Sequence, residues 1–126
     1  MHTSRTLLLL AALFAGSVFA AQSTIDDDFM RTVEDTHKSL TGNVGISNAP
    51  GSIADARELA VMFAQIEAFY VDKGDAPDAV TLSRQSRELS DAIVKSAGRQ
   101  DFETANLKTT ELSRACKSCH NFYKKS

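Results

Sequence analysis

The chain of 126 residues has no tryptophan, few prolines and few cysteines. Its two prolines, Pro50 and Pro77, stand at the borders of long segments, so proline does not interrupt any of these segments. Its two cysteines, Cys116 and Cys119, lie within four residues of each other and cannot link distant parts of the fold. This excludes a small secreted fold that is stabilised by several disulfide bonds. Sustained alternation of apolar and polar residues is also missing, so the sequence does not predict strands.

The first twenty residues contain no acidic side chain and a single Lys or Arg, Arg5. Arg5 is followed by an apolar run and then by the small residues Val18 and Ala20. This order predicts a secretory signal peptide over residues 1–20, cleaved after Ala20. The apolar run is shorter than the roughly 20 residues that cross a bilayer, and no cysteine follows it to carry a lipid. We therefore expect export to the periplasm and a mature domain over residues 21–126 with no integral membrane segment.

The charge balance is slightly acidic, with 14 Lys and Arg against 16 Asp and Glu. Removal of the leader takes away one base and no acid, so the mature chain carries a net charge of about −3. Such a chain offers no general affinity for nucleic acid or for an anionic membrane. At roughly 105 residues, the mature chain is long enough for one domain with one core.

Helical spacing of apolar residues runs through four segments. In the first, residues 25–41, Ser23 or Thr24 is placed to cap the helix, and acidic residues fill the first turn, where the helix dipole favours them. Gly42 is the expected end of this helix. Residues 43–50 are rich in Gly, Asn and Ser, so they predict a loop.

Capping residues and glycines mark the other three predicted helices. Ser52, followed by Asp55, is a capping signature for the second helix, which should end near Gly74. The third should open with Asp75 or Ala76 before Pro77 and end at Gly98. The fourth should be capped by Asp101 and run into the cysteine pair. Short connections place consecutive helices antiparallel. The predicted fold is therefore all-α, an antiparallel up-and-down four-helix bundle.

The motif that carries chemistry is C-x-x-C-H, formed by residues 116–120 on the last predicted helix. On one helical turn, the thiols of Cys116 and Cys119 reach two vinyl groups on the same edge of a porphyrin, and His120 then stands under the iron. The motif predicts one haem c attached covalently to the C-terminal helix, with the two cysteines as thioethers and His120 as an axial iron ligand.

Three other interpretations of the cysteine pair remain open at this point. A thioredoxin-like redox pair would stand at the start of a helix after a strand, whereas this pair stands near the end of a predicted helix. A zinc site needs about four ligands, which would require His37 or a carboxylate in addition to the motif. A plain disulfide would form if haem attachment failed.

With this motif near the C-terminus of four predicted helices, the chain resembles the class II cytochromes c, the cytochrome c′ family. The aromatic and basic residues after the motif, Phe122, Tyr123, Lys124 and Lys125, are similar to the family's ending. The resemblance implies a haem held by the last helix inside the bundle. Dimers are common in this family, so a homodimer is a second implication.

The resemblance also implies that a residue of the first helix decides the function. A methionine on the distal side of the haem gives a six-coordinate, low-spin electron carrier, and an apolar residue there gives a five-coordinate iron open to small gases. Met30 and His37 are the candidate ligands, and seven residues separate them by about 10 Å along a helix, so only one can reach the iron. The family position favours Met30. One turn before it, where the family commonly has a basic residue near the haem propionates, this chain has Asp26, so either Arg31 serves from a different direction or the propionates are solvated. Met62 is expected in the core.

The sequence thus predicts a periplasmic monohaem cytochrome that carries electrons between redox partner proteins, with Met30 as the sixth iron ligand. The alternative is a five-coordinate haem protein that binds or scavenges NO or CO, and a third class is a non-catalytic assembly module of a larger respiratory complex. We expect no enzyme, because the one carboxylate cluster, residues 26–28, is better placed to cap a helix. Basic residues around the attachment site form a candidate docking patch for a redox partner: Arg114, Lys117, Lys124 and Lys125.

Overall fold

The computed structural model describes residues 24–123, with side chains as far as Asn121. These residues form four helices: α1 (Asp27–Gly45), α2 (Ala49–Lys73), α3 (Pro77–Gly98) and α4 (Phe102–Tyr123). The predicted signal peptide over residues 1–20 lies outside the described residues, as do Lys124, Lys125 and the side chains of Phe122 and Tyr123. Among residues 24–123, no helix is both long and apolar enough to span a membrane.

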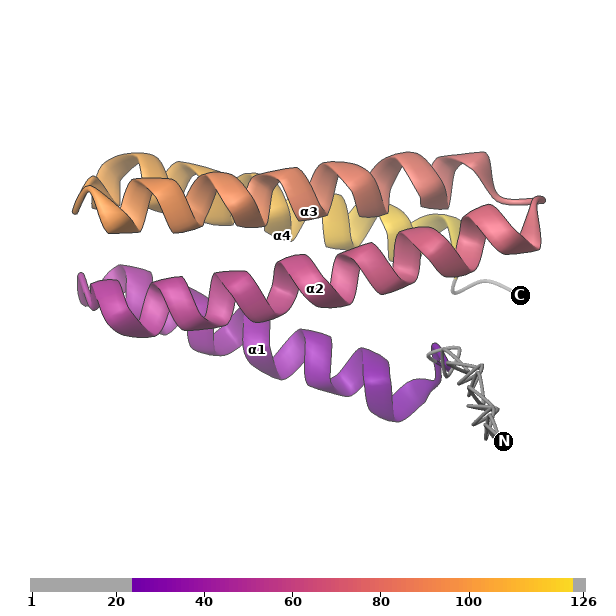
Figure 1. The fold of residues 1–126 in the computed structure, drawn as a ribbon, viewed down its shortest axis with the longest axis horizontal. Coiled ribbons are helices and arrows are strands. Elements are labelled where there is room, and N and C mark those ends of the chain that lie inside the picture. Colours follow the sequence, from indigo (N-terminus) through magenta and orange to yellow (C-terminus); the bar gives the residue numbers. More distant parts are fainter. Residues whose placement is uncertain (1–23, 124–126) are drawn as a thin grey trace, which may run out of the picture.

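The four helices run up and down in sequence order, and each packs against the next one along the chain (Figure 1). α1 also contacts α4, which closes the bundle, and the start of α1 and the end of α4 lie at the same end of the molecule. The prediction of an all-α, antiparallel up-and-down four-helix bundle is confirmed. α2 and α3 share the most extensive packing, and α1 and α4 share less than the other neighbouring pairs. The bundle is therefore loosest between its first and last helices.

The core is built from apolar side chains at three- and four-residue spacing, as expected of helices that pack side by side. Among its largest fully buried side chains are Leu40, Leu59, Ile93 and Leu112, one from each helix. These four lie in the middle of the helices or toward the end that carries the α1–α2 and α3–α4 connections. The apolar core therefore fills the interior of the bundle toward that end.

Capping residues begin the first and last helices. Asp26, rather than Ser23 or Thr24, caps α1, and its Oδ1 accepts a hydrogen bond at 2.8 Å from the backbone N–H three residues later. A carboxylate at this position also interacts favourably with the helix dipole, which a hydroxyl does not. Asp101 caps α4 as predicted, since its Oδ1 accepts from the backbone N–H of Thr104 at 3.1 Å.

The connection between α1 and α2 is shorter than the sequence predicts. α1 does not end at Gly42 but continues to Gly45, and α2 already begins at Ala49. The predicted loop over residues 43–50 was therefore wrong for most of its length, and residues 46–48 alone connect the two helices.

A polar network explains this shorter connection. Asn48 caps α2 in place of Ser52, because its Oδ1 accepts from the backbone N–H of Gly51 at 3.2 Å. The Nδ2 of Asn48 donates to Asn43 Oδ1 at 2.9 Å, and Asn43 Nδ2 donates to Asp55 Oδ2 at 2.8 Å. Asn43, which lies within α1, thus binds the side chains of Asn48 and Asp55 rather than the adjacent backbone, so it does not interrupt the helix. Ser52 is fully buried inside α2.

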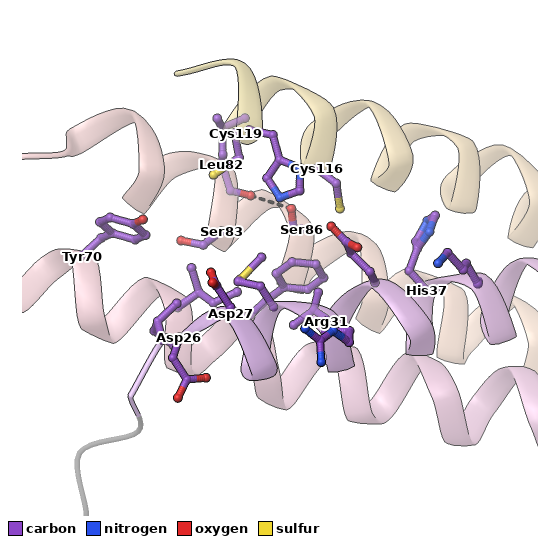
Figure 2. A pocket seen from close by; sticks show the side chains of 18 residues that line it. Asp26, Asp27, Arg31, His37, Tyr70, Leu82, Ser83, Ser86, Cys116 and Cys119 are labelled. Atoms are coloured by element: carbon purple, nitrogen blue, oxygen red, sulfur yellow. Dashed lines mark hydrogen bonds between the residues drawn. The ribbon is translucent and has the colours of Figure 1, made fainter. Parts of the chain in front are cut away.

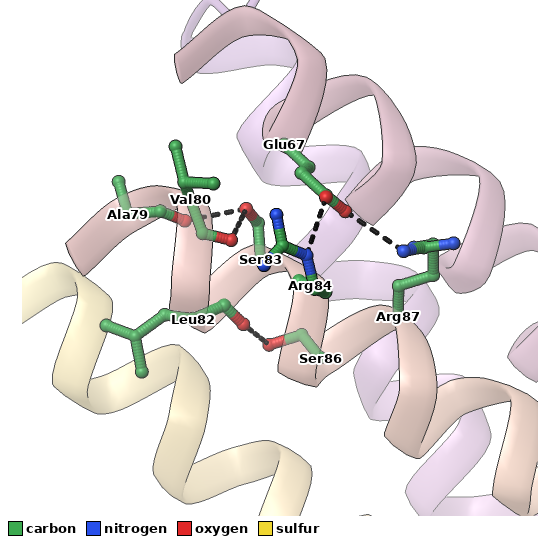
Figure 3. Close-up of polar contacts among 8 residues, drawn as sticks. All are labelled: Glu67, Ala79, Val80, Leu82, Ser83, Arg84, Ser86 and Arg87. Atoms are coloured by element: carbon green, nitrogen blue, oxygen red, sulfur yellow. Dashed lines mark hydrogen bonds and ion pairs between the residues drawn. The ribbon is translucent and has the colours of Figure 1, made fainter. Parts of the chain in front are cut away.

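An ion-pair cluster joins α2 to α3 (Figure 3). Glu67 of α2 accepts from Arg84 Nε at 3.0 Å and lies 3.2 Å from Arg87 Nη2, both on α3. The Glu67 side chain is only 17% exposed, so solvent screens this cluster less than a fully exposed pair. α2 and α3 therefore form a firmly joined pair, against which α1 is held more loosely.

Candidate haem-binding site

A cavity of about 710 Å³ lies between the four helices, toward the end where α1 begins and α4 ends. Its volume falls within the roughly 300–1,000 Å³ of small-molecule and cofactor sites. All four helices contribute to its wall. Much of this wall is apolar and consists of Ile25, Met30, Val33, Phe63, Ile66, Tyr70 and Leu82.

The three residues of the C-x-x-C-H motif line this cavity together. Cys116, Cys119 and His120 reach it from α4, and Figure 2 shows the two cysteines on the helix that faces α1 across the cavity. Residues three and four apart share one face of a helix, which explains why a single short motif delivers all three side chains. The same face carries the buried Leu112 and Ala115. The predicted haem ligands therefore lie at the apolar cavity, and both cysteines are free thiols.

The surroundings make both thiols poor acids. Burial, with smaller contributions from the nearby Cys119 and Glu34, raises the pKa of the Cys116 thiol to about 11. Burial also raises the pKa of the Cys119 thiol. A thioredoxin-like pair depends on a lowered thiol pKa, so the site disfavours that interpretation. Among the residues that the structure describes, no group of three or more His, Cys, Asp or Glu is placed to hold a metal ion.

A hydrogen bond between side chains marks the register of α1 against α4. His37 Nε2 lies within hydrogen-bonding distance of Ser113 Oγ, at 3.0 Å, and Ser113 Oγ also lies 3.2 Å from the Thr109 carbonyl oxygen. Because the two helices are antiparallel, seven residues back along α1 correspond to seven residues forward along α4. This step leads from His37 to Met30 and from Ser113 to His120. Met30 and His120 therefore stand at the same level on opposite sides of the cavity.

A second pair of residues agrees with this register. Glu34 precedes His37 by three residues and Cys116 follows Ser113 by three, and the charge of Glu34 contributes to the raised pKa of Cys116. In Figure 2, α1 runs from Asp26 to His37 while α4 runs in the opposite direction. The proximity of Glu34 to Cys116 is therefore consistent with the level along α4 that the His37–Ser113 contact gives to Met30.

The structure separates the two candidate sixth ligands. Met30 is partly buried, packs against the core and lines the cavity. His37 also lines the cavity, but its ring is bonded to Ser113, about 10 Å along the helix axis from the level of His120. Met62 is buried in the core, as predicted.

Charged residues of α1 stand along the edge of the cavity. Arg31 lines the cavity, and its guanidinium pairs with Asp28 at 3.1 Å. Lys38 also lines it and pairs with Asp35 at 3.6 Å. The predicted helix-starting role of the acidic triplet is confirmed, since Asp26 is the cap and the other two residues lie in the first turn.

Sequence reasoning missed the wall that α2 and α3 contribute. Tyr70 of α2 and Leu82, Ser83 and Ser86 of α3 line the cavity (Figure 2). The hydroxyl of Ser83 donates to the Ala79 carbonyl at 2.6 Å and that of Ser86 donates to the Leu82 carbonyl at 2.7 Å, so both hydroxyls are satisfied within their own helix. Their helical spacing marks Leu82 and Ser86 as packing residues, but spacing alone does not distinguish a wall of a cavity from the core.

We expect His37 to make the protein less stable below about pH 6.5. Burial lowers the pKa of His37 from its usual 6.5, and a hydrogen bond to the Thr109 backbone opposes this only in part. Between the folded-state pKa and 6.5, the unfolded chain binds the proton more readily than the folded chain does. The stability that neutral His37 contributes is therefore complete above pH 6.5 and is lost as the pH falls through the folded-state pKa.

Urea unfolding at about pH 7.5 and at about pH 5.5 measures this loss. His37→Gln is the control variant, because the glutamine amide carries both a donor and an acceptor for Ser113 and does not titrate. The variant should lose less free energy of unfolding over this interval than the parent protein, and equal losses would contradict the prediction.

No protein-family model, curated protein or solved structure matches the chain.

Proposed function

We propose that the protein is a periplasmic monohaem c-type cytochrome that carries electrons between redox partner proteins. Cys116 and Cys119 would hold the haem as thioethers, with His120 and Met30 as axial ligands of the iron. The observation that carries the proposal is the position of Met30, which stands level with His120 on the opposite side of an apolar cavity.

The residues around the cavity fit a haem in chemistry and in size. Two thiols and an imidazole on one helical face are the donor set for covalent attachment and iron ligation. A cavity of about 710 Å³ is large enough for a cofactor-sized ligand. Its largely apolar wall suits a flat, mostly apolar ring better than a polar substrate.

A bound haem would supply a one-electron couple at its iron. The side chains of this protein tune that couple, since a methionine–histidine ligand pair gives a higher reduction potential than two histidines do. Phe63, Ile66 and Leu82 would keep water from the ring. Arg31 and Lys38 would offer positive charge to the haem carboxylates at the edge of the cavity.

Two exposed cations, one before the motif and one within it, support docking of a redox partner. Arg114 and Lys117 are exposed on α4, and neither has an ion-pair partner among the described residues. Basic side chains near the attachment site would attract a partner with an acidic surface and accelerate the encounter.

The proposal is tested by producing the chain in a host that exports it and attaches haem to C-x-x-C-H motifs. We expect the intact mass to increase by that of one haem, and we expect the haem to remain with the polypeptide after denaturation. The oxidised protein should give a low-spin spectrum with a methionine–iron charge-transfer band in the red. The same chain produced without attachment machinery is the control.

The outcomes separate the candidate functions. A covalent haem with a high-spin spectrum would contradict the electron carrier and support the five-coordinate protein that binds NO or CO. A chain that leaves this host with no added mass would overturn the assignment as a cytochrome.

A further inference from the structure

A groove of about 390 Å³ lies at the turn between α2 and α3, at the end of the bundle where α1 begins and α4 ends (Figure 1). α2 ends at Gly74, whose φ of 76° is left-handed and suits a glycine, and α3 begins three residues later at Pro77. The walls of the groove are largely apolar and include Val71, Ala76, Pro77 and Val80. The Val71 side chain is 58% exposed, so the groove is open to a molecule outside the bundle.

Tyr70 connects this groove with the candidate haem cavity, because it lines both of them. Its ring packs edge-on against that of Phe69, with 5.1 Å between the centroids and 85° between the planes, a favourable geometry that holds the ring in place. A molecule in the groove can therefore contact the same side chain that borders the cavity. Electron tunnelling weakens steeply with distance, so the groove is a favourable place for electron exchange with an occupant of the cavity.

Acidic side chains surround the groove. Asp72, Asp75 and Asp78 are exposed, and each adjoins in sequence a residue that lines the groove. Asp72 and Asp78 have no ion-pair partner among the described residues, and Asp75 is 4.0 Å from Lys73 in an exposed pair that neutralises only one of the three charges. An apolar groove with an acidic rim is complementary to an apolar side chain that basic residues surround.

We propose that this groove is a second docking site, where a redox partner with a basic surface inserts an apolar side chain. The inference rests on the proposed function. One electron passes between the redox centre of the partner and the haem iron, which changes between Fe(II) and Fe(III) as the partner changes in the opposite sense, and no bond forms or breaks. Arg114 and Lys117 favour an acidic partner on α4. The two sites thus select partners of opposite charge, as a carrier with one donor and one acceptor requires.

Binding to the groove is tested with tris(phenanthroline)chromium(III), a tripositive complex whose ligands are flat and apolar and whose unpaired electrons broaden the NMR signals of nearby amides. We expect it to broaden the signals of Val71, Gly74, Val80 and Thr81 at about a tenfold lower concentration than hexaamminechromium(III) does, which has the same charge but no apolar ligand. This measurement does not require haem, so it separates a failure of the groove from a failure of the proposed cytochrome. Equal broadening by the two complexes would overturn the inference.

Thr81→Trp tests electron transfer at the groove, because tryptophan at this exposed position fills the groove and leaves its acidic rim unchanged. We expect oxidation of the reduced, haem-loaded protein by tris(phenanthroline)cobalt(III), which takes up one electron to become Co(II), to slow about tenfold. Oxidation by the anion ferricyanide should change by less than about twofold. Thr110→Trp is the matched control at an exposed threonine of α4 that lines neither the groove nor the cavity, and it should leave both rates unchanged.

The double variant Asp72→Asn, Asp78→Asn tests the charge of the partner. We expect it to slow oxidation by the cobalt complex about fivefold and to make this rate less dependent on salt, because the cation is no longer attracted to the rim. Rates with the cobalt complex that neither this variant nor Thr81→Trp lowers would overturn the inference. Self-association that Thr81→Trp abolishes in sedimentation would also overturn it, since a second copy would then occupy the groove.

Discussion

We expect Met30→Ala to convert the haem-loaded protein from six-coordinate and low-spin to five-coordinate and high-spin, with loss of the methionine–iron charge-transfer band. An alanine side chain ends at Cβ and cannot reach across the cavity. His37 cannot replace the lost ligand, because it stands about 10 Å along α1 from Met30 and is bonded to Ser113. Optical spectra of the oxidised protein measure this change.

Met62→Ala is the matched control for this substitution. It removes the same side-chain atoms, but from the core of α2 rather than from α1 opposite His120. We expect it to lower the free energy of unfolding by about 2–5 kcal/mol and to leave the spectrum low-spin. If the low-spin spectrum survives Met30→Ala, Met30 is not the ligand, and His37→Ala becomes the variant to examine.

The double substitution Cys116→Ser, Cys119→Ser should have the second-largest effect. Without its thiols the chain cannot hold haem covalently, so the cavity of about 710 Å³ would lack the covalently attached haem that we propose. A group bound only to the folded state at 100 to 1,000 times its dissociation constant contributes about 3–4 kcal/mol, so we expect a loss of at least about 3 kcal/mol in the free energy of unfolding. Urea unfolding of the loaded parent and the haem-free variant measures the difference.

The loss of haem should loosen the helices unequally. α1 packs less extensively on its neighbours than α3 does, and the cavity adjoins it, whereas Glu67 and its two arginines tie α2 to α3. Hydrogen exchange should therefore accelerate most in α1 and least in α2 and α3. Lys117→Ala, at the exposed position between the cysteines, should retain both the haem and the stability. Equal exchange rates in all four helices of the double variant would contradict this account.

The helices were predictable from the sequence because their signals are local. Asp101 and Gly74 act within one turn of the helix that they begin or end, and the structure places both as predicted. The α1–α2 connection was not predictable in this way. Asn43 is a typical loop residue, yet it lies within α1, because its amide binds Asn48 and Asp55, and Asp55 lies on the next helix.

The candidate site also has one part that local sequence signals predicted and one part that they did not. Cys116, Cys119 and His120 follow from spacing on one helix, so the sequence by itself determined that their side chains share a face and that this donor set suits a haem. It also determined the four helices, through apolar periodicity within each segment. What the sequence left open was the side chain that stands opposite His120, since Met30 and His37 both lie on the first helix.

Only the tertiary structure decided that question, because the answer depends on how two helices at opposite ends of the chain are aligned. His37 and Ser113 are 76 positions apart, and their hydrogen bond brings Met30 level with His120. The cavity wall from α2 and α3 and the raised pKa of the Cys116 thiol arise in the same way, from groups that meet only after the bundle has closed. Spacing along one helix is a property of the chain, whereas alignment between helices is a property of their packing.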